Sequence, residues 1–283
     1  MKKITIQGVE GCYHEVAARN FFSGEEVSVV PCATFGKLFD TMADDRSLLG
    51  IAAIENTIAG SLLQNHELLS NSRLKIIGEE KIRISHVVAV MPGQGIDDVK
   101  EVHSHPIALM QCGKWLKAHP EIKVVESDDT AESAKIIAEH KIMGQAAICS
   151  QWAAELYGLE IIDRAIETNP HNFTRFLILS DQEVVEEYID QTKINKASLQ
   201  FSLAHSTGSL SKILAILSFY DINLTKIQSL PIIGREWEYL FYIDVTFDNL
   251  ERYRQSLDAI RPLITNFKVL GEYAEMVTQK IDI

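Results

Sequence analysis

The sequence predicts an α/β chain with mainly parallel sheets, followed by a smaller α+β part. Three observations predict this. Over the first two-thirds of the chain, strand-like stretches alternate with amphipathic, helix-like stretches. A polar, acidic stretch at residues 180–196 then interrupts the pattern. Beyond it, the segments follow the order strand, helix, strand, strand, helix, strand, which is that of a ferredoxin-like unit.

The elements of the first part follow from their apolar patterns. Residues 3–7 alternate polar and apolar, as in a half-buried strand, and residues 48–54 form a nearly continuous apolar run, as in a strand covered on both faces. Thr34 is placed to cap the second helix. The expected strands are residues 3–7, 27–30, 48–54, 74–77, 84–90, 99–103, 122–125, 146–149 and 173–179, and the expected helices are residues 13–22, 35–42, 62–69, 108–118 and 131–140.

The last part of the chain has a different pattern of apolar residues. Leu210, Ile213, Leu214 and Leu217 recur at helical spacing, and Pro231 interrupts a strand. We therefore expect a first domain over residues 1–180, a linker over residues 181–196 and a second domain over residues 197–283. The expected strands here are residues 197–204, 224–233, 239–247 and 267–273, and the expected helices are residues 209–220 and 250–260.

Charge and composition exclude several classes of function. With 27 Lys+Arg and 39 Asp+Glu, the formal net charge is −12, which argues against nucleic acid or an anionic membrane as a partner. We find neither a signal-peptide core nor a run of about 20 apolar residues, so a cytoplasmic protein is expected. The cysteines are scattered, which predicts free thiols rather than a disulfide frame or a metal site: Cys12, Cys32, Cys112 and Cys149.

Two polar segments follow expected strands, where α/β sheets usually hold ligands. The glycines of residues 8–11 either turn backbone N–H groups toward an anion or simply form a tight turn. Glu55 and Asn56 end the apolar strand. Asn56 either donates to a substrate oxygen or, together with Ser61, caps the next helix.

Two further segments carry polar groups. His103 and His105 could form a metal pair, but no third ligand has a recognisable spacing, so no metal is expected. Ser104 fits a helix-entry turn, with Gln111 near the same opening. Arg175 lies among large apolar residues and needs a defined partner, either an internal carboxylate or a carboxylate ligand. Phe173 and Phe176, by residue type, fit the core.

Taken together, these segments resemble the prephenate dehydratase family over nearly the whole chain. They match, in order, its P-I-E-N-S/T-x-x-G-S, S-H-P-Q-A-x-x-Q-C and N-x-T-R-F segments, and the G-A-L and I-N-L-T-K-I segments of its regulatory ACT domain. The matching residues are Ile54-Glu55-Asn56-Thr57 with Gly60-Ser61, Ser104-His105-Pro106 with Gln111-Cys112, Asn172-Phe173-Thr174-Arg175-Phe176, Gly208-Ser209-Leu210, and Ile222-Asn223-Leu224-Thr225-Lys226-Ile227.

The resemblance implies conversion of prephenate to phenylpyruvate with loss of water and carbon dioxide. It implies a two-lobed catalytic domain of the type II periplasmic-binding-protein kind, a C-terminal ACT domain, feedback by L-phenylalanine and a homo-oligomer, dimer or tetramer. No cofactor is expected, because aromatisation supplies the driving force. The implied catalytic residues are Thr174, Asn56, Ser104 and Gln111; the substrate-binding residues are Arg175, Glu55 and Phe176; and the phenylalanine-binding residues are Gly208, Leu210 and Asn223.

The sequence departs from the family pattern at several places. In the N-terminal segment G-P-x-G-T-Y/F-S, proline, threonine and serine are replaced by Val9, Cys12 and His14, and a glutamate stands at position 10. Ile107 replaces a glutamine. The regulatory E-S-R-P segment reads Gln228-Ser229-Leu230-Pro231, which removes two charges and predicts altered coupling to phenylalanine.

Two other functions stay open at this level. An arogenate dehydratase performs the same reaction on the aminated substrate, and no residue of the sequence excludes it. A non-catalytic, amino-acid-sensing protein also suits a two-lobed fold with an ACT-like unit. The intact Thr174-Arg175-Phe176 segment favours the enzyme.

Overall fold

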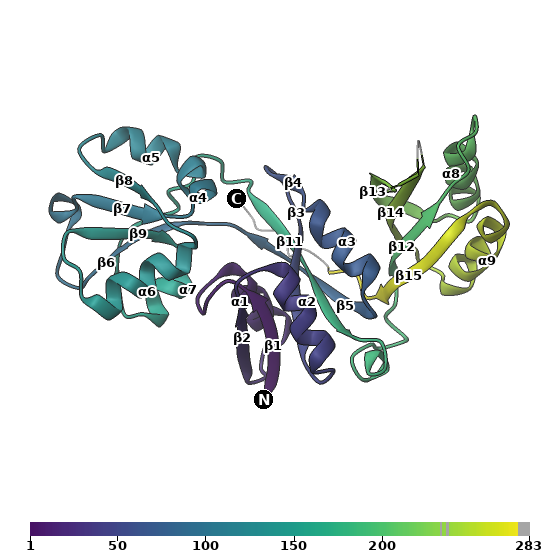
Figure 1. The fold of residues 1–283 in the computed structure, drawn as a ribbon, viewed down its shortest axis with the longest axis horizontal. Coiled ribbons are helices and arrows are strands. Elements are labelled where there is room, and N and C mark those ends of the chain that lie inside the picture. The colour runs from purple at the N-terminus through teal and green to yellow at the C-terminus, as the bar shows by residue number, and fades with distance from the viewer. Residues whose placement is uncertain (233, 236–237, 277–283) are drawn as a thin grey trace. The chain divides into compact units, whose positions relative to one another are not determined.

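A computed structural model describes residues 1–232, 234–235 and 238–276 (Figure 1). The chain forms two compact units. The first comprises residues 1–60 and 80–176, and the second comprises residues 61–79 and the chain from residue 177 onward. Within the described residues, no helix has the length and apolar character that crossing a membrane requires.

The first sheet has the strand order β2-β1-β3-β11-β5, with the short β4 paired to β3. Strand β1 runs parallel to both of its neighbours, and its Ile4 and Ile6 are fully buried. The elements are β1 (Lys2–Gln7), α1 (Tyr13–Phe21), β2 (Val27–Cys32), α2 (Phe35–Asp44), β3 (Leu49–Asn56), β4 (Gly60–Ser61), α3 (Leu63–Asn71), β5 (Leu74–Arg83) and β11 (Phe173–Asp181).

The second sheet lies in the first unit and has the order β10-β6-β9-β7-β8. Strand β7 runs parallel to β8 and β9, while β6 runs antiparallel to β9 and β10, so this sheet is mixed rather than mainly parallel. Figure 1 shows α4 and α5 on one side of this sheet and α6 and α7 on the other. The elements are β6 (Val87–Val90), η1 (Ile96–Asp98), β7 (Glu101–Ser104), α4 (Pro106–Gln111), α5 (Gly113–Ala118), β8 (Lys123–Glu126), α6 (Thr130–His140), β9 (Gln145–Cys149), α7 (Gln151–Leu156) and β10 (Glu160–Arg164).

One local expectation for this part was wrong, and two elements were missed. The helix expected over residues 108–118 is two helices, because the backbone at Cys112 leaves helical geometry (φ −97°, ψ 20°) and a new helix begins at Gly113. The short α7 and β10 were not predicted. Helix α7 has only six residues, too few for a helical repeat to be recognised, and β10 has charged residues at both ends and depends on pairing with β6.

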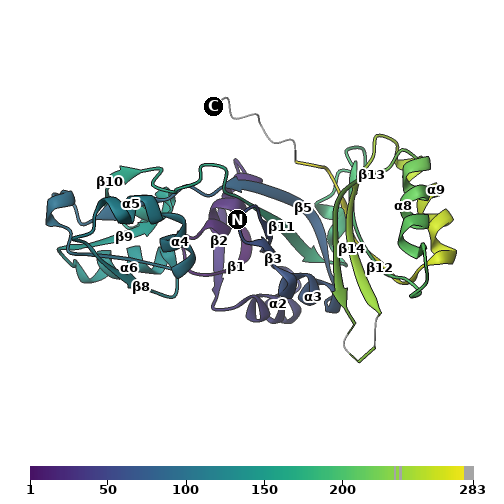
Figure 2. The same ribbon diagram turned by 90° about the horizontal axis from the view of Figure 1, so that it is seen from above.

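The third sheet has the order β13-β14-β12-β15, and its strands pair antiparallel. The predicted order of strand, helix, strand, strand, helix, strand is confirmed, and Figure 2 shows α8 and α9 together on one face of this sheet. The expected boundaries of the two domains stay a prediction. The elements are η2 (Val185–Glu187), β12 (Lys196–Ser202), α8 (Ser209–Phe219), β13 (Asn223–Pro231), β14 (Tyr239–Thr246), α9 (Leu250–Ile260), η3 (Arg261–Leu263) and β15 (Thr265–Tyr273).

His14, one of the departures from the family pattern, is a buried residue of the first unit. Its ring packs edge-on against Phe35 and Phe176, with ring centroids 5.4 and 5.0 Å apart. Its Nε2 atom accepts a hydrogen bond from the Ala53 N–H at 3.4 Å, which requires that nitrogen to be unprotonated. Burial lowers the pKa of His14 from 6.5 to about 3.

We expect His14 to make the fold sensitive to mild acid. Below pH 6.5 the unfolded chain protonates this histidine while the folded chain does not, so the free energy of unfolding falls as the pH falls toward about 3. At pH 5 this group alone costs about 2 kcal/mol. Urea unfolding at pH 7.5 and pH 5.0 measures it, with His14→Gln as the control that cannot be protonated. An equal loss of stability in both proteins would contradict the assignment.

Candidate active site

Thr174 and Asn56 meet where β3 ends beside the start of β11. The Thr57 N–H donates to the Phe173 carbonyl at 2.9 Å, which joins the two segments. Asn56 Nδ2 then lies 2.9 Å from Thr174 Oγ1 and 2.8 Å from Asn172 Oδ1. The neighbouring strands thus bring together two residues that the sequence analysis assigned to catalysis.

Asn56 holds Thr174 rather than capping a helix. Its Oδ1 atom accepts hydrogen bonds from the N–H groups of Ile58 and Ala59, at 2.9 and 2.8 Å, in the turn that follows β3. This fixes the orientation of the amide, so Nδ2 must face Asn172 and Thr174. Its N–H groups therefore have acceptors within the chain. Donation by Asn56 to a substrate would require one of these bonds to break.

The Thr174 hydroxyl keeps its own proton available. It accepts from Asn56, so that bond uses a lone pair of Oγ1 and not the O–H donor. A hydroxyl that accepts a hydrogen bond becomes a better donor, because neighbouring hydrogen bonds polarise one another. Thr174 is 9% exposed, so a bond that it donates is little weakened by water.

Asn172 is a residue of this cluster that the sequence analysis assigned no role. Its side chain is fully buried, and its Oδ1 accepts from Asn56. Because that contact uses the oxygen, the nitrogen is turned the other way, and Asn172 Nδ2 has no hydrogen-bond partner in the described part of the chain. The resemblance contained the residue, but only the fold shows that it orients Asn56.

Arg175 pairs with Glu55 at a separate position. Arg175 Nη1 lies 4.0 Å from Glu55 Oε2, and the arginine side chain is 10% exposed against 41% for the glutamate. Adjacent residues of a strand point to opposite faces, so Thr174 and Arg175 do not share one face of β11. Phe176 is buried at 2% exposure with its ring against His14, which leaves little of it for a ligand.

Ser104 is used inside the second sheet. It is fully buried at the end of β7, and its Oγ donates to the Ile148 carbonyl at 2.6 Å. The expected helix-entry turn is present, with His105 as its cap, because His105 Nδ1 accepts from the Ile107 N–H at 3.2 Å. His103 Nε2 lies 3.2 Å from a Glu101 oxygen. The described residues contain no group of three or more His, Cys, Asp or Glu side chains suited to a metal.

Gln111 belongs to a buried hydrogen-bonded chain that sequence reasoning missed. Its Oε1 atom lies 3.0 Å from His86 Nε2, and His86 Nδ1 lies 3.2 Å from the Tyr13 hydroxyl. Burial lowers the pKa of His86, and the hydrogen bond to Gln111 and the charge of Glu167 partly oppose this shift. No spacing in the sequence connects these residues, since they come from α1, from α4 and from the segment between β5 and β6. That segment joins the part of the first unit around β1–β3 to the part built on the second sheet, and these two parts are called its lobes below.

The loop of residues 8–11 forms a tight turn in which the N–H groups of Gly8 and Gly11 are used within the protein. The Gly8 N–H donates to the Cys32 carbonyl, and the Gly11 N–H donates to the Glu15 carboxylate at 2.6 Å. Glu15 is buried and paired with Arg19 at 2.7 Å, so the chain supplies its own anion at the start of α1. Glu10 is exposed, and its carbonyl accepts from the Tyr157 hydroxyl.

The three residues implied for phenylalanine binding do not meet within one chain. Gly208 precedes α8, and Leu210 lines a cavity of about 140 Å³ together with Tyr239 at the start of β14. Asn223 pairs with Thr246 at the far end of the same strand. Tyr239 and Thr246 are seven positions apart on this strand, which corresponds to about 23 Å.

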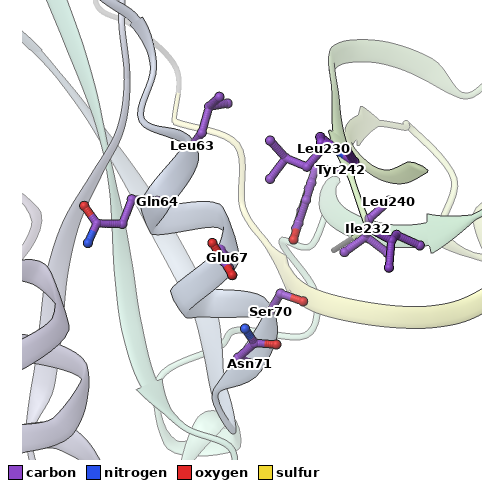
Figure 3. A pocket seen from close by; sticks show the side chains of 10 residues that line it. Leu63, Gln64, Glu67, Ser70, Asn71, Leu230, Ile232, Leu240 and Tyr242 are labelled. Atoms are coloured by element: carbon purple, nitrogen blue, oxygen red, sulfur yellow. The ribbon is translucent and has the colours of Figure 1, made fainter. Parts of the chain in front are cut away.

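A larger cavity of the second unit lies between α3 and the strands β13 and β14 (Figure 3). Its volume is about 580 Å³. Leu230, which stands where the family pattern has arginine, lines the strand side, and Glu67 lines the helix side. The other lining residues are Leu63, Gln64, Ser70, Asn71, Pro231, Ile232, Leu240 and Tyr242.

Comparison with known proteins places this geometry in context. The family described as prephenate dehydratase matches residues 4–184. A protein of Arabidopsis thaliana described as arogenate dehydratase/prephenate dehydratase 2, chloroplastic, is 34% identical over 284 residues, which cover 96% of this chain and 72% of that protein.

Solved structures give similar results. The structure of a prephenate dehydratase from Arthrobacter aurescens in complex with L-Phe superposes with a TM-score of 0.83 at 26% identity, covering 96% of this chain and 89% of that chain. A structure described as GqqA, a novel type of quorum quenching acylase, superposes with a TM-score of 0.85 at 29% identity, covering 97% and 98%.

Proposed function

The chain belongs to the prephenate dehydratase family, and on that premise we propose that it converts prephenate to phenylpyruvate with Thr174 as the donor to the departing hydroxyl oxygen. One observation carries the assignment of Thr174. Its Oγ1 accepts from an amide, Asn56, which the backbone holds in a single orientation, so the threonine proton is available to a ligand.

The reaction requires little more than binding and one placed donor. Prephenate has two carboxylates and a ring hydroxyl opposite the carboxylate that is lost. As the bond to that carboxylate breaks, its electron pair enters the ring, the C–O bond opposite breaks, and the oxygen leaves as water after gaining a proton. Negative charge develops on the departing oxygen, where the Thr174 O–H can stabilise it. A hydroxyl is a weak acid, so this group acts as an oriented donor rather than as an early proton source.

Arg175 is proposed to hold a substrate carboxylate, with the substrate at the end of β11, since Thr174 and Arg175 start from opposite faces of that strand. One of the contacts of Arg175 is with Glu55, whose carboxylate is half-exposed and 4.0 Å away, which is long for a charge-assisted hydrogen bond. A substrate carboxylate that reaches the buried guanidinium can form the shorter, bidentate contact. In a chain with a net charge of −12, such a contact gives the dianion a local site of positive charge.

Ser104 and Gln111 differ in whether their polar groups are available to a substrate. Ser104 links β7 to β9 through the Ile148 carbonyl and contacts substrate only if its hydroxyl leaves that carbonyl. Gln111 is partly exposed, and one side of its amide faces His86, so the other side is available to a ligand.

Acyl-group hydrolysis, the activity named for one structural neighbour, has less support in these residues. The described contact of the Thr174 hydroxyl is an amide and not a base that could activate it. Burial raises the pKa of Cys12, Cys112 and Cys149 to about 12, so these thiols are not nucleophiles at neutral pH.

Incubation of the purified protein with prephenate or with arogenate tests the function directly. Formation of phenylpyruvate or of phenylalanine, followed by absorbance and chromatography, separates the two dehydratases. Binding of either compound without product would indicate the amino-acid-sensing alternative.

We also propose that residues 197–283 form an ACT regulatory domain that binds L-phenylalanine between two copies of the chain. The βαββαβ order and the cavity at Leu210 support this assignment. Leu210 of α8 lies beside the start of β14, and Asn223 of β13 lies beside its end. One phenylalanine molecule therefore reaches both kinds of residue only if a second copy supplies one of them. A homo-oligomer is therefore part of the proposal.

We expect L-phenylalanine to inhibit the protein and Asn223→Ala to weaken that inhibition about tenfold, since one amide hydrogen bond to the ligand is lost. Titration of phenylalanine in the prephenate assay measures this, and light scattering at the same concentrations reports the oligomer. Thr225→Ala, a substitution two residues away on the same strand, is the matched control. Equal inhibition of Asn223→Ala and the unmodified protein would place the effector elsewhere.

A further inference from the structure

His86 lies where the two lobes of the first unit are joined. It follows β5 and precedes β6, and its carbonyl accepts from the Ile166 N–H in the return segment between β10 and β11. Its own N–H donates to the Glu167 carboxylate at 3.0 Å, and Glu167 is also paired with Arg83 at 3.1 Å. The backbone of His86 is thus held from both crossing segments, and its side chain is 2% exposed.

The side chain of His86 connects one residue from each lobe. On one side, its ring meets Tyr13 of α1 edge-on, with ring centroids 5.7 Å apart at 84°. On the other side, Nε2 meets the Gln111 amide at the end of α4. The His86 imidazole is therefore the middle group of a hydrogen-bonded series that starts at Tyr13 and ends at Gln111.

The protons available along the hydrogen-bonded series Tyr13–His86–Gln111 determine which nitrogen of the His86 ring is protonated. The Tyr13 hydroxyl has one proton, and the Ser85 carbonyl at 2.7 Å can only accept it. Tyr13 remains protonated, because burial raises its pKa well above the usual value. The Tyr13 oxygen then faces His86 Nδ1 as an acceptor, so Nδ1 bears a proton.

The protonation of the His86 ring determines whether the oxygen or the nitrogen of the Gln111 amide faces the ring. In the structure the Gln111 Oε1 atom faces Nε2 at 3.0 Å. A neutral ring with its proton on Nδ1 leaves Nε2 bare, so the amide, whose oxygen and nitrogen have nearly the same shape, must be turned so that its nitrogen donates to Nε2. A charged ring would instead donate to the amide oxygen. The two arrangements differ by a half-turn of the amide, which changes its hydrogen bonding but not its shape. The desolvated position of His86 favours the neutral ring.

We infer that His86 is a positioning residue of the dehydratase site: anchored by Tyr13, its ring holds the Gln111 side chain in the orientation that presents the remaining amide oxygen and N–H to the substrate. The inference rests on the proposed function, since it assigns Gln111 a contact with prephenate. It adds a residue that makes no substrate contact itself and acts through Gln111.

Two substitutions separate positioning from simple support of the fold. Asparagine places an amide near the position of Nδ1, so His86→Asn keeps a partner for Tyr13 and loses the one for Gln111. Glutamine reaches the position of Nε2, so His86→Gln keeps the partner for Gln111. Steady-state kinetics with prephenate should show kcat about tenfold lower for His86→Asn, KM changed less than about threefold, and His86→Gln within about threefold of the unmodified protein.

A double mutant tests whether the effect passes through Gln111. The variant His86→Asn/Gln111→Ala should be no slower than Gln111→Ala alone, because the group that His86 positions is already absent. Thermal unfolding of each variant accompanies the kinetics. If His86→Asn does not fold, Tyr13→Phe, which removes the anchor of Nδ1, should lower kcat by about threefold instead.

The outcomes distinguish failure of the positioning role of His86 from failure of the proposed function. Equal kcat values for His86→Asn and His86→Gln, or multiplicative losses in the double mutant, would overturn the positioning role. So would full activity of Gln111→Ala, and in these cases the proposed function would stand. An unmodified protein that does not turn over prephenate would instead overturn the proposed function, and the positioning role with it.

Discussion

Thr174→Ala should lower kcat for prephenate by about 10²–10³ while KM changes little. The expected loss is that of one donor placed at an atom where charge develops in the transition state. In the ground state the departing oxygen is a neutral hydroxyl, so the same hydrogen bond contributes little to binding. Steady-state kinetics under saturating prephenate measures the effect.

The matched control for this prediction is Thr174→Ser. Serine keeps the hydroxyl that accepts from Asn56 and should retain most of kcat, since it lacks only a methyl group. Near-normal turnover by Thr174→Ala would remove Thr174 from the mechanism. A rise in KM with unchanged kcat would make it a ground-state binding group instead.

Lys196→Met should destabilise the second unit by about 3–5 kcal/mol, because it leaves a buried carboxylate without its main partner. Lys196 Nζ lies 2.8 Å from Glu79 Oε1, and the two side chains are 3% and 0% exposed. A second carboxylate, that of Glu275, lies 3.6 Å from the same nitrogen. Urea unfolding at neutral pH gives the change in the free energy of unfolding.

The control removes both charges. In Lys196→Met/Glu79→Gln the fully buried carboxylate is gone, and only the partly exposed Glu275 still loses a partner, so part of the lost stability should return. A loss below about 1 kcal/mol in the single variant, the range of exposed ion pairs, would contradict the buried character of this pair.

Lys196 also shows that a polar, acidic composition does not by itself mark a stretch as exposed. It ends a polar, acidic stretch that the sequence analysis treated as a linker, yet it begins β12 and is buried. Asp181, at the other end of that stretch, closes β11 and lies 2.8 Å from Arg73 Nε. Residue type alone does not reveal such charges as internal, because their partners lie more than a hundred residues away in the chain.

In the candidate site, too, the sequence identified the motif residues, whereas the contacts between them depend on the fold. Residues 54–57 and 172–176 were found from the sequence because the motifs are contiguous, and each motif lies on one strand end. The pairing of Asn56 with Thr174 and of Glu55 with Arg175 depends on the adjacency of β3 and β11. The roles of Asn172 and His86 were not found, because each acts through a residue distant in sequence.

The sequence by itself determined the order of most helices and strands, the βαββαβ pattern of the last part and the family. These depend on local periodicity and on contiguous motifs, which the linear chain contains in full. Only the tertiary structure decided that Glu15 fills the anion position at α1, that His14 is buried and neutral, and that Thr174 Oγ1 accepts a hydrogen bond from Asn56. Each of these depends on burial and on partners brought together by sheet pairing, and the free energy of a buried polar group is set by those partners rather than by its neighbours in sequence.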